Sequence, residues 1–141
     1  MKKVITKPQF IFLLLAIISL IIGFIYKNGE FVISIYSTYI IVKSWSISMF
    51  TSIFLVLIAV NYTSLSFINK PHKRVLTIIH IALQITALIP LWYMISISNI
   101  KKSYEDEIII NSVLVISFGV FLFATLIHLI NFFMSLISKK D

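Results

Sequence analysis

Two histidines, His80 and His128, lie within long apolar stretches of the sequence. An ionisable side chain in such a stretch is costly, so it is a functional candidate by default. Each histidine belongs to a polar stripe at helical spacing. The stripes contain Thr77, His80 and Gln84 in one stretch, and Thr125, His128, Asn131 and Ser135 in another. Because an unpaired polar group in hydrocarbon costs several kcal/mol, we expect both stripes to face the protein interior.

The two histidines lie at comparable depth. His80 comes six residues after Arg74, roughly 9 Å along a helix, and His128 comes eleven residues before Lys139, roughly 16 Å. The two imidazoles could therefore lie at the same depth in the bundle and bind the iron of a b-type haem as its two axial ligands. The alternative is structural, either a hydrogen-bonded histidine pair or separate contacts from each histidine to Ser or Thr. His72, which lies in a basic connection, is expected to be a solvated loop residue.

Other chemistries lack the residues that they need. No carboxylate lies near either histidine in the sequence to orient it as a base, which argues against Ser-based hydrolysis. A proton-coupled transporter commonly uses an intramembrane carboxylate, and the apolar stretches contain none. The sequence has no three-ligand metal cluster, and without Cys it has no thiolate metal site, disulfide or covalent haem attachment. The sequence therefore predicts that the protein is not an enzyme.

The elements that hold these residues follow from the placement of charge. The chain has 141 residues, of which 60% are apolar and 12% charged, whereas soluble domains contain about 25% charged residues. All charged residues fall outside four stretches, each long enough to cross a bilayer core of about 30 Å. Lipid offers no partners to backbone groups, so these stretches must be helical despite their Ile content. We predict helices at about 8–26, 44–69, 75–100 and 108–138, in a single transmembrane domain that covers 1–141.

The predicted fold is an all-α integral membrane four-helix bundle. Eight Lys and Arg residues lie at the chain ends and in the middle connection, against four in the other two connections, which predicts cytoplasmic termini (N-in, C-in). No small-residue cleavage site follows the first helix, so we expect it to be retained rather than removed as a signal peptide. We therefore place the protein in the bacterial cytoplasmic (inner) membrane. The net charge of +7 fits this topology and attraction to anionic lipid headgroups, and it indicates no nucleic-acid partner.

Two local features refine this arrangement. The segment 31–42 is uncharged, too short to span and too apolar for an ordinary loop, so we expect an interfacial segment that folds over the bundle on its outer side. Ala16, Ser19 and Gly23 form a stripe of small residues on the first helix. Such a stripe lets a neighbouring helix approach closely.

Two segments resemble a known membrane protein. The stretch Ile35-Tyr-Ser-Thr-Tyr-Ile-Ile-Val-Lys-Ser-Trp-Ser46 resembles a segment of haem-copper oxidase (cytochrome c oxidase) subunit I that reads His-Asp-Thr-Tyr-Phe-Val-Ile-Ser-His-Phe-His. Near the end of the chain, Ser117-Phe-Gly-Val and Leu126-Ile-His-Leu-Ile-Asn-Phe-Phe-Met-Ser135 are similar to the last helix of that subunit. The resemblance implies that the whole chain corresponds to the last four transmembrane helices of subunit I.

The residues that hold metal and haem in that family are missing from this chain. The family's first His and Asp contribute to a metal site, and its last two His bind the haem irons. The matching positions here are Tyr36, Ser37, Ser44 and Ser46. A Ser hydroxyl does not replace a neutral imidazole as a haem ligand. The resemblance therefore implies shared ancestry and architecture without oxygen reduction.

Together these observations predict a non-catalytic small membrane protein without a cofactor, an accessory or assembly partner of a respiratory membrane complex. Its expected partners are the lipid bilayer and either subunits of such a complex or a second copy of the chain. The alternative is a b-type haem protein that carries electrons and uses His80 and His128 as axial ligands.

Overall fold

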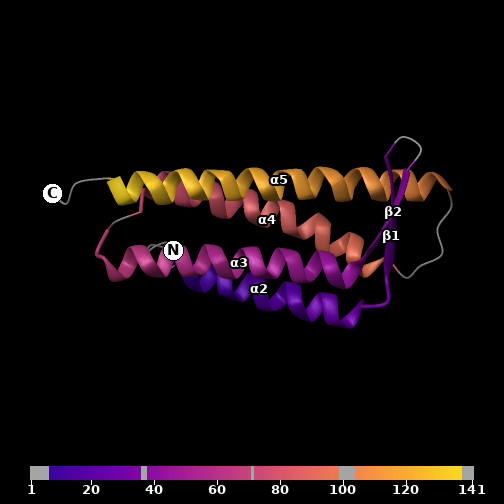
Figure 1. The fold of residues 1–141 in the computed structure, drawn as a ribbon, viewed down its shortest axis with the longest axis horizontal. Helices are drawn as coiled ribbons and strands as arrows, with labels where there is room; N and C mark the ends of the chain where they lie inside the picture. The colour runs from indigo at the N-terminus through magenta and orange to yellow at the C-terminus, as the bar shows by residue number, and fades with distance from the viewer. Residues whose placement is uncertain (1–6, 36–37, 71, 99–103, 138–141) are drawn as a thin grey trace.

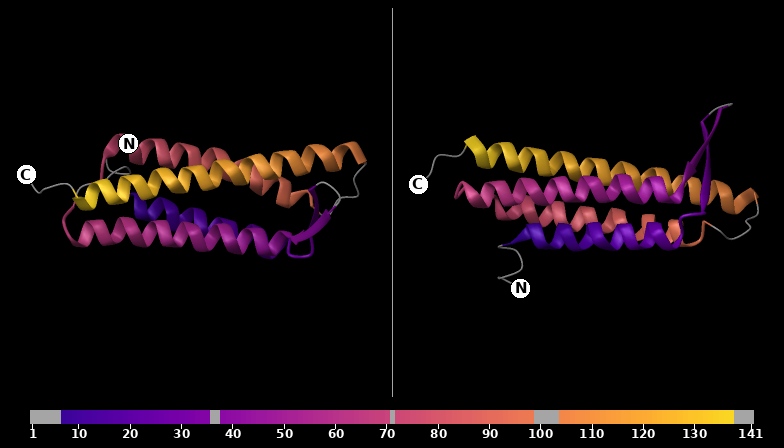
Figure 2. Two further views of the ribbon diagram at one scale, coloured as in Figure 1. Left: turned by 45° about the horizontal axis from the view of Figure 1, so that its top comes forward. Right: turned by 60° about the horizontal axis from the view of Figure 1, so that its bottom comes forward.

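The computed structural model describes residues 7–35, 38–70, 72–98 and 104–137. Within them the elements are α2 (Pro8–Ile25), β1 (Glu30–Ile35), β2 (Thr38–Lys43), α3 (Ser44–Phe67), α4 (Arg74–Ser96) and α5 (Tyr104–Ile137). The helices run in alternating directions along one long axis (Figure 1), so the start of α2 and the end of α5 lie at the same end of the bundle. Two further views show the same bundle with the hairpin of β1 and β2 at its other end (Figure 2).

Each of the four helices in the described part of the chain is long and apolar enough to cross a membrane. Their bounds agree with the predicted helices to within a few residues, and the predicted residues 99–100 and 138 lie outside the described part. The clearest difference is α5, which begins at Tyr104, before its apolar part starts at Ile108. The charged residues that precede Ile108 in the sequence therefore end the apolar stretch without ending the helix.

The segment 31–42 requires a correction to the all-α prediction. β1 and β2 form an antiparallel hairpin in which Glu30 pairs with Lys43. This segment is rich in β-branched and aromatic residues, which favour strands where the backbone is not confined to lipid. Asn111 Nδ2 on α5 donates a hydrogen bond of 2.6 Å to the carbonyl of Val32, and the hairpin crosses α5 at the end of the bundle (Figure 1). The segment thus lies over the bundle as a hairpin, and its position at a membrane interface stays a prediction.

The closest helix packing pairs α2 with α3 and α4 with α5. The stripe formed by Ala16, Ser19 and Gly23 is buried on α2, as its small residues predicted. Ser52 Oγ on α3 donates a hydrogen bond of 2.9 Å to the carbonyl of Ala16. A Cβ atom on Gly23 would collide with Ser48 of α3. The small residues therefore allow α2 and α3 to approach closely.

Side chains also join the two helix pairs. Trp92 Nε1 on α4 donates a hydrogen bond of 2.8 Å to Ser19 Oγ on α2. The core between the pairs is apolar, and its largest fully buried side chains include Phe12, Leu55, Ile58, Leu88, Leu91, Ile95 and Phe121. This core positions the polar side chains that are described next.

Candidate functional site

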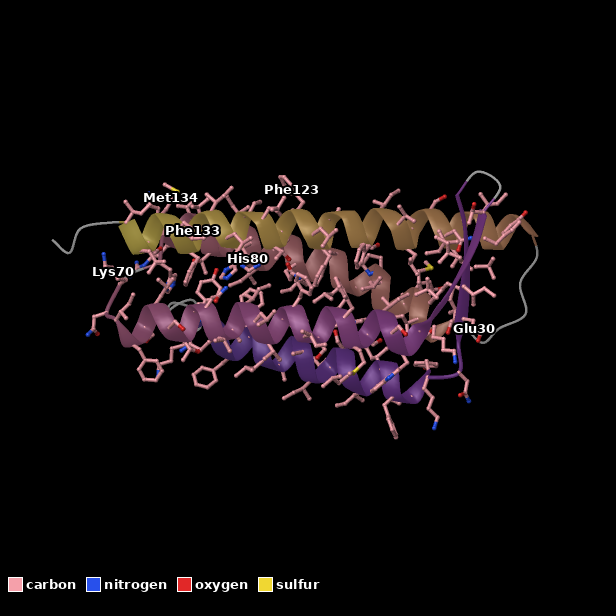
Figure 3. All side chains as sticks on the ribbon, viewed as in Figure 1. Glu30, Lys70, His80, Phe123, Phe133 and Met134 are labelled. Carbon is pink, nitrogen blue, oxygen red and sulfur yellow. The ribbon has the colours of Figure 1, made fainter. Side chains whose placement is uncertain are left out.

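The polar stripes of α4 and α5 meet inside the bundle, where Figure 3 shows His80. The buried members, each at most 1% exposed, are Thr77, His80 and Gln84 on α4, and His128, Asn131 and Ser135 on α5. Thr125 is only half-buried, and its hydroxyl donates a hydrogen bond to the carbonyl of Phe121 on its own helix. The prediction that the stripes face the interior is therefore confirmed for all members except Thr125.

The two imidazoles stack on each other. The ring centroids of His80 and His128 are 5.0 Å apart, and the ring planes differ by 28°. Phe12 of α2 stacks on His80, with the centroids 4.7 Å apart, and the ring of Tyr62 of α3 lies 4.7 Å from that of His128. Each of the described helices thus contributes one ring to an aromatic cluster, which we call the histidine cluster.

Each imidazole has a hydrogen-bond partner on α3. Tyr62 Oη lies 3.2 Å from His80 Nδ1, and Asn61 Nδ2 lies 3.2 Å from His128 Nε2. The amide nitrogen of Asn61 is a donor, so His128 Nε2 accepts, and the proton of the neutral ring lies on Nδ1. The histidines are therefore oriented by α3 as well as packed between α4 and α5.

Tyr62 and Phe12 were not among the residues expected at this site. Tyr62 shares the buried face of α3 with Leu55, Ile58, Ala59 and Leu65. This spacing of three and four residues is readable in the sequence and could have identified Tyr62 as facing inward. Phe12 has no comparable signal, because many residues of α2 are apolar and only packing decides which of them meets His80.

Further hydrogen bonds close the histidine cluster on the side of the connection between α3 and α4. Asn131 Nδ2 donates to Thr77 Oγ1 at 3.0 Å, and the backbone N–H of Lys73 donates to Asn131 Oδ1 at 3.1 Å. His72 is half-buried, and its ring lies edge-on to Tyr62 with the centroids 5.6 Å apart. His72 thus lies in the connection, as expected, but it is only partly exposed, because the bond from the backbone of Lys73 to Asn131 holds the connection against α5.

Several buried polar atoms near the stacked rings have no hydrogen-bond partner within the described residues. They are His80 Nε2, His128 Nδ1 and both amide atoms of Gln84, one helical turn from His80. A buried polar atom without a partner costs free energy. These atoms are therefore the ones that are available to bind a further group.

The stacked arrangement does not fit a haem iron. Axial ligation requires a lone pair from each imidazole to point, within the plane of its ring, at one metal between the two rings. The stacked rings instead lie face to face, and Phe12 and Tyr62 pack against them where a porphyrin would need space. Haem binding by His80 and His128 would therefore require both rings to turn out of the cluster. The assignment of these histidines as haem ligands stays a prediction.

The serines at the positions of the family's haem ligands have other surroundings. Ser44 is fully buried, and its hydroxyl donates a hydrogen bond of 3.0 Å to Ser98 Oγ. Its backbone N–H donates to the carbonyl of Gly29 at 2.8 Å. Ser46 is exposed, and positions 36–37 lie outside the described residues. Ser44 is thus part of the packing at the base of the hairpin.

The described residues define a helical bundle whose helices are suited to a membrane, with a hairpin at one end and a polar cluster inside. No family model, curated protein or solved structure matches this chain. The similarity to haem-copper oxidase subunit I therefore rests on the residues of the two segments alone, and what it implies for function is a proposal.

Proposed function

We propose that this chain is a non-catalytic integral protein of the bacterial cytoplasmic membrane that acts as an accessory or assembly partner of a respiratory membrane complex. The observation that carries the proposal is the environment of Ser44, where the similar family has a haem-ligating His. The hydroxyl of Ser44 bonds to Ser98, which supports a structural use of this position. The similarity supports a shared architecture, and the Ser44 contact supports a role without haem at that point.

Small residues close the bundle around Ser44. A Cβ atom on Gly29 would come within 2.6 Å of Ser44 Oγ and would also collide with Ser98. The chain thus enters β1 directly against the start of α3 and the residues that follow α4. Close packing of this kind favours a structural scaffold over a pocket for a large planar group.

The hairpin supplies a surface outside the helices. β2 exposes three consecutive large residues, Tyr39, Ile40 and Ile41. An isolated two-stranded hairpin is only marginally stable in water, and an exposed strand edge readily pairs with another chain. These features support a protein partner at the hairpin, and the similarity favours a subunit of a respiratory complex.

Photo-crosslinking in native membranes tests this proposal. A photoreactive amino acid replaces Tyr39, which is 72% exposed on the hairpin, and in a matched control it replaces Tyr93, which is 60% exposed on α4. After purification in mild detergent, we expect a respiratory-complex subunit to be crosslinked through position 39 and not through position 93. A protein that purifies alone, or that crosslinks only to a second copy of itself, would contradict the proposal.

Binding of a b-type haem is a second candidate because two imidazoles are buried together on adjacent helices, although both rings would have to turn out of the histidine cluster to ligate the iron. Reduced-minus-oxidised spectroscopy of the purified protein, supplied with haem, distinguishes a haem protein from the cofactor-free accessory protein proposed above. The leading proposal expects no haem spectrum, and it expects His80→Gln and His128→Gln to leave partner recovery unchanged. A haem spectrum in the wild type that disappears in both variants would establish the second candidate instead.

A further inference from the structure

A pocket lies at the hairpin end of the bundle, away from the histidine cluster. It has a volume of about 400 Å³ and is lined by Phe24, Lys27, Asn28, Lys43 and Trp45. These residues come from the end of α2, the turn that follows it, the last position of β2 and the first turn of α3. The entry and the exit of the hairpin therefore build one site together.

The pocket is positively charged. Within the described side chains, no ion pair joins Lys27 or Lys43 to a carboxylate, although Glu30 is the cross-strand partner of Lys43. Lys27 Nζ instead lies 5.7 Å from the centre of the Phe24 ring. Lys43 is the N-cap residue of α3, and no side chain caps this helix. The positive end of the α3 dipole therefore also lies at the pocket. The site therefore favours an anion with several acceptor oxygens, such as a phosphate group.

An apolar face leads from the pocket along α2. Ile17, Ile21 and Phe24 follow one another at spacings of four and three residues, and each is more than half exposed. Trp45, on the other side of the pocket, has an amphipathic ring of the kind that favours the boundary between hydrocarbon and headgroups. A phosphate in the pocket would therefore lie at headgroup level, directly above a surface suited to a hydrocarbon chain.

We propose that this pocket binds the phosphate headgroup of an anionic phospholipid. The ammonium groups of Lys27 and Lys43 hold the phosphate oxygens, and an acyl chain lies along Ile17, Ile21 and Phe24. Basic pockets between transmembrane helices are known to bind anionic lipid headgroups. The lipid joins the end of α2 to the start of α3 and stabilises the base of the hairpin.

Native mass spectrometry of the protein in detergent, with added phosphatidylglycerol or phosphatidylcholine, tests the site. The variant K27Q/K43Q lowers the net charge from +7 to +5 at the pocket. The matched control K73Q/R74Q makes the same change at the opposite end of the bundle, where both side chains are exposed. We expect the wild type and the control to prefer phosphatidylglycerol by about tenfold or more, and the pocket variant to lose this preference.

Two further measurements separate the alternatives. K27R/K43R retains both charges and is expected to retain the preference, while circular dichroism verifies that every variant folds. If the pocket variant and the control variant lost the preference for phosphatidylglycerol equally, the preference would be a general effect of charge and the proposal would be overturned. A wild type without this preference would also overturn it. Displacement of the lipid by inorganic phosphate at equal concentration would identify a free-anion site and overturn the lipid assignment.

Discussion

At the scale of single residues, the histidine cluster depends on partners from other helices. Tyr62 lies at hydrogen-bond distance from His80, and Asn61 from His128. Hydrogen bonds between membrane helices contribute about 0.6 kcal/mol on average and about 1.7 kcal/mol at most. The orientation of both imidazoles therefore depends on weak hydrogen bonds, each of which a single substitution on α3 can remove.

Tyr62→Phe keeps the ring in the cluster and removes only the hydroxyl that lies 3.2 Å from His80 Nδ1. We expect the free energy of unfolding to fall by about 1 kcal/mol, because neither ring nitrogen of His80 then has a hydrogen-bond partner among the described residues. Titration with SDS in mixed micelles, followed by circular dichroism, measures this change. Tyr93→Phe, on the exposed face of α4, is the matched control and should change stability by less than about 0.5 kcal/mol. Equal effects of the two substitutions would contradict the assigned bond.

At the scale of elements, the contact between α2 and α3 depends on Gly23, since a Cβ atom there would collide with Ser48. Gly23→Ala is therefore expected to lower the free energy of unfolding by about 1–3 kcal/mol, because the helices must move apart. The control is Gly119→Ala on α5, where a Cβ atom would meet nothing within 4 Å. Helix propensity alone should stabilise that variant by up to about 1 kcal/mol. The same SDS titration measures the free energy of unfolding of both variants. A Gly23→Ala variant as stable as the wild type would refute the close approach of α2 and α3.

The hairpin is held to α5 by a side chain that is distant from it in sequence. Asn111→Ala removes the amide that donates to the carbonyl of Val32. We expect hydrogen exchange of the backbone amides in β1 and β2 to accelerate by about threefold, because the hairpin opens more often. Ser112→Ala serves as the control, since its hydroxyl bonds to Ile108 on the same helix. Unchanged exchange in both variants would mean that α5 does not hold the hairpin.

At the scale of the whole molecule, the alternating helices place the start of α2 and the end of α5 opposite the hairpin (Figure 1). The chain has no Cys, so single substitutions can report its orientation. In intact spheroplasts, we expect a membrane-impermeant maleimide to label Tyr39→Cys, and to label Lys73→Cys only after disruption, because the end richer in Lys and Arg stays in the cytoplasm. Both positions are exposed. The reverse labelling pattern would overturn the N-in, C-in topology.

The sequence by itself determined the helices, because a backbone that must cross lipid without charged residues satisfies its polar groups only as a helix. It also indicated that His80 and His128 face inward, because their polar neighbours recur at helical spacing. Both conclusions depend only on the spacing of residues along the chain and on the apolar lipid that surrounds each helix. Neither requires knowledge of which helices are neighbours.

Only the tertiary structure decided which side chains meet. The stacking of His80 on His128 and the contacts of Phe12 and Tyr62 with them depend on the rotation of each helix about its axis. That rotation is set by the sum of contacts between segments far apart in the chain. The hairpin was likewise decided by strand pairing, in which β1 and β2 satisfy each other's backbone groups.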